Sequence, residues 1–330
     1  MAGVIRAITH GLSRINPVAF RIGPLSVHWY GLAYLTGFIV GYFIIRFFAR
    51  RWKLGLSDDD LLTILLVMII AGVGGSRLFY CLFYNPGYYW AHPLDIFKTW
   101  DGGMSFHGSI IGAVIGLVIT ARKLKQPFAR LADLCVIALP FGLLLGRLAN
   151  FINGELWGRV TTVPWGVVFP AAGALPRHPS ALYEAALEGV VLFTVMVVLG
   201  LRRRIWPRGF LTGVMMTLYS IFRVFVEFFR EPDAQLGFLL KTNWLTMGMV
   251  LSLPLFITGV GFMVWSFKHK DKDRTGLQPK DKTNPEDTGG SRTEARRSRR
   301  NSLPLCPADK GTAGNKADTT EARAATLAVK

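Results

Sequence analysis

The chain has few charged residues and very few cysteines. Of its 330 residues only 18% are Asp, Glu, Lys or Arg, whereas 51% are hydrophobic. This composition excludes an ordinary soluble domain of the same length and favours a protein that crosses a membrane several times. Cys81, Cys135 and Cys306 lack the spacing of metal ligands, and two of them fall in apolar segments. We therefore expect neither a disulfide framework nor a metal site.

Residues 1–26 lack the apolar core of a cleaved signal peptide. We expect them to form an interfacial segment, with a short amphipathic helix along the membrane surface. The apolar runs that follow each approach the ~20 residues that a membrane-spanning helix needs. They predict an all-α polytopic membrane protein whose transmembrane domain covers residues 27–267. The seven spans are expected near residues 27–48, 61–84, 106–121, 131–152, 182–201, 209–229 and 244–267.

Two segments outside the spans have compositions of their own. Residues 153–181 contain four prolines among Val, Trp and Phe, and we expect them to fold as a cap over the outer face. Residues 268–330 are rich in charged residues and poor in aromatics, which predicts a disordered basic cytoplasmic tail. The tail holds 15 Lys and Arg residues against 9 Asp and Glu, so most of the formal net charge of +17 lies outside it. Much of that charge is in short loops, which argues against nucleic acid as a partner.

Positive charge alternates between the loops. The loops after the first, third and fifth spans are strongly basic, whereas those after the second, fourth and sixth carry fewer Lys and Arg residues. Because basic loops stay on the cytoplasmic side, this alternation places the N-terminus outside and the C-terminus in the cytoplasm. Arg6, Arg14 and Arg21 oppose this orientation, but they form one segment against three loops.

Polar side chains inside the spans gather at one depth of the predicted bundle. A charged group at the centre of a membrane helix costs roughly 2.5–3.5 kcal/mol on insertion scales, so such groups are rare and usually functional. With the orientation given above, five spans place their ionisable or phenolic side chains in the outer half of the membrane. In the sixth span four of them recur at helical spacing and form a continuous stripe. The residues concerned are Tyr30, Arg77, His107, Arg147, Asn150, Tyr219, Arg223, Glu227 and Arg230.

The arginines within the spans outnumber Glu227, which predicts a pocket with a net positive charge. The guanidinium fork suits bidentate binding of phosphate, so the expected ligand is anionic, such as a phospholipid head group near the outer leaflet. His107 is available there for proton transfer. Simpler interpretations stay open: Arg147 as a residue that reaches the membrane interface, Arg223 and Glu227 as a pair that neutralises itself, and His107 as a packing residue.

Several segments form a recognisable combination, and the most specific is Gly146-Arg147-x-Ala149-Asn150-Phe151-Ile152-Asn153-x-Glu155-x-x-Gly158. Segments 28–31, 101–108, 177–184 and 223–230 belong to the same combination. In these segments, and in their order over roughly residues 20–267, the chain resembles the bacterial prolipoprotein diacylglyceryl transferases. Ala149 and Ser109 stand where relatives commonly have glycine, and the basic tail is not part of the family core.

The resemblance implies an enzyme of the bacterial inner membrane, with a periplasmic N-terminus and cap and a cytoplasmic C-terminus. It would transfer the diacylglyceryl group of phosphatidylglycerol to the lipobox cysteine of a prolipoprotein that still carries its signal peptide. The second product would be glycerol 1-phosphate. The implied partners are thus phosphatidylglycerol, the prolipoprotein and the lipid bilayer, and no cofactor or metal is implied.

The resemblance also implies roles for residues at matched positions. Arg147 and Arg223 would hold the phosphate, and His107 would take the proton from the acceptor thiol; these are the three catalytic candidates. The other substrate-binding candidates would contact the head group, shape the pocket or orient neighbouring donors. They are Tyr30, Asn150, Glu155, Gly158, Glu227 and Arg230.

A different class of protein, a transporter of anions or lipids, is the alternative. Its polar groups would line a path between the leaflets, at the midplane and in the inner half of the membrane. The sequence places few polar groups there. A membrane scaffold would leave the arginines within the spans unexplained.

Overall fold

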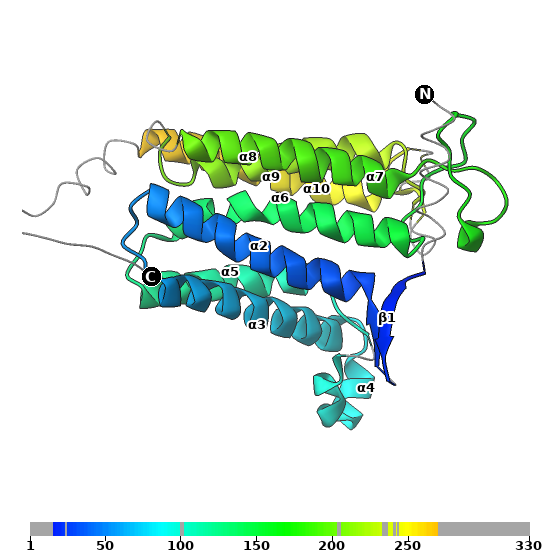
Figure 1. The fold of residues 1–330 in the computed structure, drawn as a ribbon, viewed down its shortest axis with the longest axis horizontal. Coiled ribbons are helices and arrows are strands. Elements are labelled where there is room, and N and C mark those ends of the chain that lie inside the picture. The colour runs from blue at the N-terminus through cyan, green and yellow to red at the C-terminus, as the bar shows by residue number, and fades with distance from the viewer. Residues whose placement is uncertain are drawn as a thin grey trace, which may run out of the picture. The chain divides into compact units, whose positions relative to one another are not determined.

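The computed structural model describes residues 16–23, 25–99, 102–202, 206–232, 237–239, 242 and 244–269, which lie within the first of two compact units, residues 1–277 and 278–330. Helices running side by side dominate this part of the chain (Figure 1). The long ones are α2 (Trp29–Arg51), α3 (Asp58–Phe83), α5 (Phe106–Lys123), α6 (Phe128–Ile152), α9 (Phe210–Glu227), α10 (Met247–Lys268) and a composite helix of α7 (Ser180–Glu184), η4 (Ala185–Val191) and α8 (Leu192–Leu201).

Six of these helices are long and apolar enough to cross a membrane, by length and composition. They correspond to six of the predicted spans. The predicted third span, near residues 106–121, is the 18-residue helix α5. At 1.5 Å per residue it measures about 27 Å, slightly less than the ~30 Å hydrocarbon core of a bilayer. The predicted helical membrane fold is confirmed, and the prediction of about seven spans is compatible with the six candidate spans and α5.

Local sequence signals set several helix boundaries. Ser57 and Asp60 form a reciprocal capping box at the start of α3, and Ser105 accepts a hydrogen bond from the Gly108 N–H at the start of α5. Such caps satisfy backbone N–H groups that have no partner within the helix. Basic residues occupy the last turns of α2, α5 and α10, where positive charge interacts favourably with the helix dipole.

A short hairpin lies where we expected an amphipathic helix. Within residues 16–28, β1 (Val18–Ile22) and β2 (Leu25–His28) pair antiparallel, with Ile22 opposite Leu25. Gly23, directly after β1, has a φ of +57°, a left-handed conformation that glycine adopts at no steric cost. The helical expectation therefore fails for these residues, because β-branched and aromatic residues alternate there. Residues 1–15 lie outside the described part.

The ends of the helices differ. At one end lie the hairpin, the short helices α4 (Pro86–Ala91), η1 (Pro93–Phe97) and η3 (Pro170–Ala172), and the irregular segment 153–179; we call it the hairpin end (Figure 1). At the opposite end α2, α5, α8 and α10 finish; we call it the basic end. The predicted disordered tail covers residues 268–330. Lys268 belongs to α10, and the residues from 270 onward lie outside the described part.

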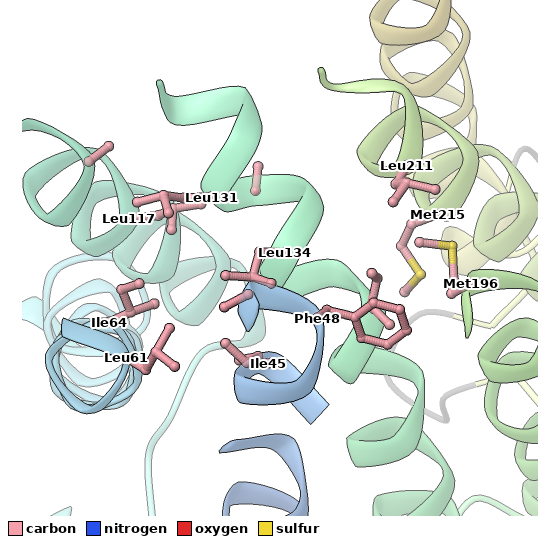
Figure 2. Close-up of a cluster of buried hydrophobic side chains, with 14 of the residues drawn as sticks. Ile45, Phe48, Leu61, Ile64, Leu117, Leu131, Leu134, Met196, Leu211 and Met215 are labelled. Atoms are coloured by element: carbon pink, nitrogen blue, oxygen red, sulfur yellow. The ribbon is translucent and has the colours of Figure 1, made fainter. Parts of the chain in front are cut away.

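Apolar packing is concentrated towards the basic end. Side chains from α2, α3, α5, α6, α8 and α9 form one cluster, in which α6 lies between the others (Figure 2). Ile64, Leu134 and Met196, from three of these helices, are fully buried. On α6 the buried carboxylate of Asp133 also accepts hydrogen bonds from the backbone N–H groups of Gly209 and Thr212, at 2.8 and 2.9 Å. Asp133 thereby caps the start of α9 and fixes it against α6.

Glycines allow α3 and α5 to approach closely. A Cβ atom on Gly112 would overlap the carbonyl oxygen of Ala71, and one on Gly108 would overlap the backbone of Gly75. Gly108 and Gly112, four residues apart on α5, are therefore packing residues, as is usual for helices that associate in lipid.

Candidate active site

Four buried or half-buried charged side chains join α6 to the composite helix and to α9 at the hairpin end. Arg147, in the last turns of α6, lies 3.1 Å from Glu184 and 3.2 Å from Glu188, measured between guanidinium nitrogens and carboxylate oxygens. Arg223, on α9, pairs with the other oxygen of Glu184. Glu184 therefore lies between the two arginines that the sequence selected as phosphate ligands.

The pairs continue towards the end of α9. Arg223 also pairs with Glu227 one turn further on, and the hydroxyl of Thr246 donates a hydrogen bond of 2.7 Å to Glu227. Arg230 extends the set, with a guanidinium nitrogen 3.7 Å from Glu184 and 4.0 Å from Glu227. We call the six residues the ion network: Arg147, Glu184, Glu188, Arg223, Glu227 and Arg230.

The expected excess of positive charge is absent from this network. It contains three guanidiniums and three carboxylates, and the side chains of Glu184 and Glu188 are fully buried. The prediction counted Glu227 alone and left out Glu184 and Glu188 of the fifth span. Full burial of unbalanced charge is expensive, which is why the arginines are matched by glutamates from that span. Tertiary packing thus turns the predicted cationic pocket into a balanced one.

Some polar atoms of the network remain without a hydrogen bond. Among the described residues these include Nε of Arg147 and Oε1 of Glu188, both fully enclosed. Buried polar atoms normally have partners, so such atoms are candidates for contact with a ligand. Glu184 and Glu188 lie at the start of the composite helix, where η4 has π-helical hydrogen bonding. Single π-helical turns within α-helices are frequent at functional sites.

The signature after Arg147 forms a compact turn at the end of α6. Asn150 is buried and donates a hydrogen bond of 3.0 Å to Glu155, and Asn153 donates one of 3.2 Å to the other oxygen of the same carboxylate. Glu155 itself is exposed. Leu156 has a φ of +55°, a conformation that is uncommon outside glycine. These contacts position the chain as it leaves the membrane helix.

Gly158 lies where three segments meet. Its N–H donates a hydrogen bond of 2.8 Å to the carbonyl of His178, and it forms an isolated β-bridge with Arg230. A Cβ atom there would overlap the carbonyl oxygens of His178 and Phe229. Glycine is therefore required by close backbone approach, and Gly158 acts on the site by holding Arg230 in place.

The imidazole of His178 belongs to an aromatic cluster beside this junction. Its Nδ1 lies 3.1 Å from the hydroxyl of Tyr183, which also accepts a hydrogen bond from the Trp165 indole. Burial lowers the pKa of His178. The cluster helps to pack segment 153–179 against the start of the composite helix.

Tyr30, in the first turn of α2, contacts a second tyrosine. Its hydroxyl accepts a hydrogen bond of 3.4 Å from the hydroxyl of Tyr34, one turn further along the helix. The sequence did not single out Tyr34. Two regularities could have indicated the missed residues: Tyr34 follows Tyr30 at helical spacing, and Glu188 is a carboxylate inside an apolar span.

Arg77 has a different role from the other arginines. Its buried guanidinium donates hydrogen bonds of 2.7 to 2.9 Å to three backbone carbonyl groups. Those of Asp95 and Ile96 belong to η1, and that of Lys98 follows it. It also bonds the carbonyl groups of Gly102 and Gly103. Arg77 therefore clamps this loop at the hairpin end, and its charge is not part of the ion network.

His107 lies at the first turn of α5, on a helix that does not contribute to the ion network. Its side chain is exposed, and α5 packs against α3 and α6. Like the network, it lies towards the hairpin end, because Ser105 at the start of α5 donates its N–H to the carbonyl of Ser76 in the last turns of α3. Its catalytic role stays a prediction.

Together these features define a multi-pass helical membrane protein with a buried, charge-balanced site at one end of its helices. The family profile described as "Prolipoprotein diacylglyceryl transferase" matches residues 17–265. The chain belongs to this family, and it is a transferase of lipoprotein biosynthesis.

Similar curated proteins carry the name phosphatidylglycerol–prolipoprotein diacylglyceryl transferase. One from Geobacter sulfurreducens is 50% identical over 256 residues, which cover 78% of this chain and 97% of the relative. One from Rhizobium leguminosarum bv. trifolii is 48% identical, covering 76% and 91%. One from Coxiella burnetii is 46% identical, covering 78% and 98%. The similarity thus spans nearly the whole of each relative.

Proposed function

We propose that this chain transfers the diacylglyceryl group of phosphatidylglycerol to the lipobox cysteine of a prolipoprotein in the bacterial inner membrane. The sulfur of the acceptor would form a thioether bond to the glyceryl carbon while the bond from that carbon to the phosphate oxygen breaks. Glycerol 1-phosphate leaves with the electron pair of the broken bond. The proton of the thiol is taken by a base, because the thiolate is the effective nucleophile.

The observation that carries this proposal is the ion network in a chain of this family. The leaving phosphate gains negative charge as the bond breaks, and fixed guanidiniums in a site of low dielectric stabilise such charge. The glutamates hold Arg147 and Arg223 in position before the substrate arrives, so little reorganisation is needed during the reaction. The enclosed Nε of Arg147 has no hydrogen-bond partner, and we assign it as a donor to a phosphate oxygen of the bound lipid.

The remaining site residues would act around this centre. We assign Tyr30 to the head group, Asn150 and Glu155 to the turn that follows Arg147, and Gly158 to the placement of Arg230. Glu227 would hold Arg223. The transporter alternative gains no support from the network, because all six residues lie at the hairpin end and do not form a path through the bundle.

The direct test is a transfer assay. Membranes containing the chain would be incubated with phosphatidylglycerol labelled in its acyl chains and a lipobox peptide, and the product would be examined by mass spectrometry. We expect addition of one diacylglyceryl group to the cysteine and release of glycerol 1-phosphate. A peptide with serine in place of the cysteine is the control. A folded preparation that binds the lipid but never modifies the peptide would contradict the proposal.

We further propose that the hairpin end faces the periplasm and the basic end faces the cytoplasm, as the loop charges indicate. In a chain whose own cysteines are replaced by serine, Trp157→Cys should react with an impermeant maleimide in intact spheroplasts. Lys53→Cys, at the opposite end, should react only after permeabilisation. The reverse pattern would show that the orientation is wrong and that the site faces the cytoplasm.

Lysine substitutions test whether the guanidinium groups bind phosphate. We expect Arg147→Lys and Arg223→Lys each to lower the transfer rate about tenfold or more, because lysine keeps the charge but loses the bidentate fork. A charge-assisted hydrogen bond contributes about 1.5–3 kcal/mol, which corresponds to this loss. Rates would be measured at matched amounts of folded protein.

The matched control for these substitutions is Arg46→Lys. Arg46 pairs with Asp58 at 2.7 Å, at the basic end and away from the network. It should retain nearly the full rate. If either network variant were as active as this control, the arginine concerned would serve to balance glutamate and not to bind phosphate.

A further inference from the structure

We propose that the basic end carries a binding site for an anionic phospholipid, separate from the ion network. A crevice of about 740 Å³ opens there between the start of α6, the segment preceding α9 and the end of α10. This volume is within the range of about 300–1,000 Å³ typical of small-molecule sites. The crevice lies at the opposite end of the helices from the proposed catalytic residues, so the proposal does not depend on their roles.

The walls of the crevice are apolar and extend into the membrane-spanning part of the chain. Phe128 from α6 and Phe262 and Trp265 from α10 contribute aromatic surface. Thr258 on α10 and His269 directly after it line the crevice as well, and their 11 positions of separation correspond to about 16 Å at 1.5 Å per residue. A crevice of this length and composition can accommodate part of an acyl chain lying along the helix.

The polar groups of the crevice lie where the helices end. Arg208 and His269 are both lining residues, and Lys268 precedes His269 at the end of α10. The crevice also includes the first turn of α6, where Pro127 provides no side-chain cap and the helix dipole is positive. A negatively charged group is therefore favoured at this level. Basic pockets between membrane helices at the cytoplasmic side are a recurrent site for anionic lipid head groups.

The interior of the crevice is open, although its walls are well packed. A Cβ atom on Gly261 would meet no other atom within 4 Å, so the space directly beside this residue is open. By contrast, a Cβ atom on neighbouring Gly209 would lie 3.3 Å from Trp265 and 3.5 Å from Ala129. The wall residues Trp265 and Ala129 are thus packed against Gly209, whereas the space beside Gly261 is open to a ligand.

Phospholipid fits this crevice better than the chain's own continuation does. Residues 270–330, which follow His269, are rich in charged and small polar residues and would not match aromatic walls. A phospholipid has an apolar acyl chain at one end and a phosphate at the other. The crevice likewise has aromatic side chains along the helices and cationic side chains at the helix ends. The proposed ligand is therefore a glycerophospholipid with a net negative charge.

Photo-crosslinking can locate such a lipid. The full-length chain in lipid nanodiscs would be irradiated with phosphatidylglycerol that carries a diazirine in its acyl chain, and crosslinked peptides would be mapped by mass spectrometry. We expect labelling of α10 around residues 258–265. Gly261→Trp should reduce the labelling of α10 roughly tenfold, because the indole would occupy the space that the ligand needs. Transfer activity should stay close to that of the wild type.

Two comparisons make the result decisive. Ile257→Trp adds similar bulk at an exposed position of α10 that does not line the crevice, and should leave labelling unchanged. A phosphatidylcholine analogue should label several-fold less than the anionic lipid, and Arg208→Gln should narrow that difference.

Equal labelling of the Gly261→Trp variant and the wild type, or equal labelling by the two lipids, would mean ordinary bilayer lipid only. Labelling that appeared only after deletion of residues 270–330 would show that the chain itself fills the crevice and would likewise overturn the proposal.

Discussion

Replacement of Glu184 by alanine is expected to destabilise the protein more than any other single change in the ion network. Its carboxylate lies within ion-pairing distance of Arg147, Arg223 and Arg230, and its side chain is fully buried. Without it, three guanidiniums would face two remaining carboxylates. Removal of one partner from a buried ion pair costs about 3–5 kcal/mol, because the charge left behind is neither solvated nor paired.

The loss should be visible in two measurements. Thermal unfolding in detergent should begin at a clearly lower temperature, and the transfer rate per folded molecule should fall about 100-fold or more, since both phosphate-binding arginines lose their support. Glu184→Gln keeps the shape and some hydrogen bonds, so it should recover part of the stability but little of the rate. Unchanged unfolding and turnover in the alanine variant would show that the network is not the structural centre of the site.

Two further variants separate position from charge. Glu188→Ala should have a smaller effect than Glu184→Ala, because Glu188 pairs with Arg147 alone among the ion pairs of the described residues. Asp58→Ala removes an acidic residue that pairs with Arg46 and Arg50 near the exposed basic end, and should change stability least. The order of the three effects follows from burial and from the number of arginines that each carboxylate contacts.

Replacement of His107 by glutamine is expected to reduce transfer by roughly 10²–10⁴-fold, the usual contribution of a general base. The acceptor thiol has a pKa near 8.5 in water, so only a few per cent is thiolate at neutral pH. Histidine changes its charge between about pH 5 and 8 and is suited to accept the proton. Glutamine retains the size and some hydrogen bonding but cannot act as a base. Binding of phosphatidylglycerol should survive, because the arginines remain.

The pH dependence distinguishes this role from its rival. If His107 is the base, the variant should regain much of its rate as the pH approaches the pKa of the thiol, because thiolate then forms without assistance. If His107 merely orients the head group, the variant should be equally defective at every pH. That result, or the loss of lipid binding, would reject general-base catalysis. His92→Gln is the matched control, since His92 is an exposed histidine at the end of α4 and should behave like the wild type.

The sequence was informative about elements whose signal is local. Seven apolar runs located the long helices to within a few residues, because a membrane span must be apolar over its whole length whatever its neighbours are. The signature from Gly146 to Gly158 identified Arg147, Asn150 and Glu155, and the structure places all three at one end of α6.

Other features depended on which helix faces are turned towards each other. Arg77 and Arg147 are both arginines near the end of a membrane helix, and nothing in their immediate sequence distinguishes them. In the fold one donates to the carbonyl groups of a loop and the other pairs with buried glutamates. The hairpin at residues 18–28 was also missed, since its strands are short and pairing is decided by contacts between segments.

The sequence by itself thus determined the membrane helices, the family and the residue types available for binding phosphate. The tertiary structure alone decided the charge of the site, because Glu184 and Glu188 balance Arg147 and Arg223 across three different helices. Hydropathy is a property of each segment taken alone, whereas an ion pair depends on the rotation and depth of two helices relative to one another. In a medium that cannot solvate charge, that relative placement determines whether a buried arginine is supported by a partner or exposed to lipid.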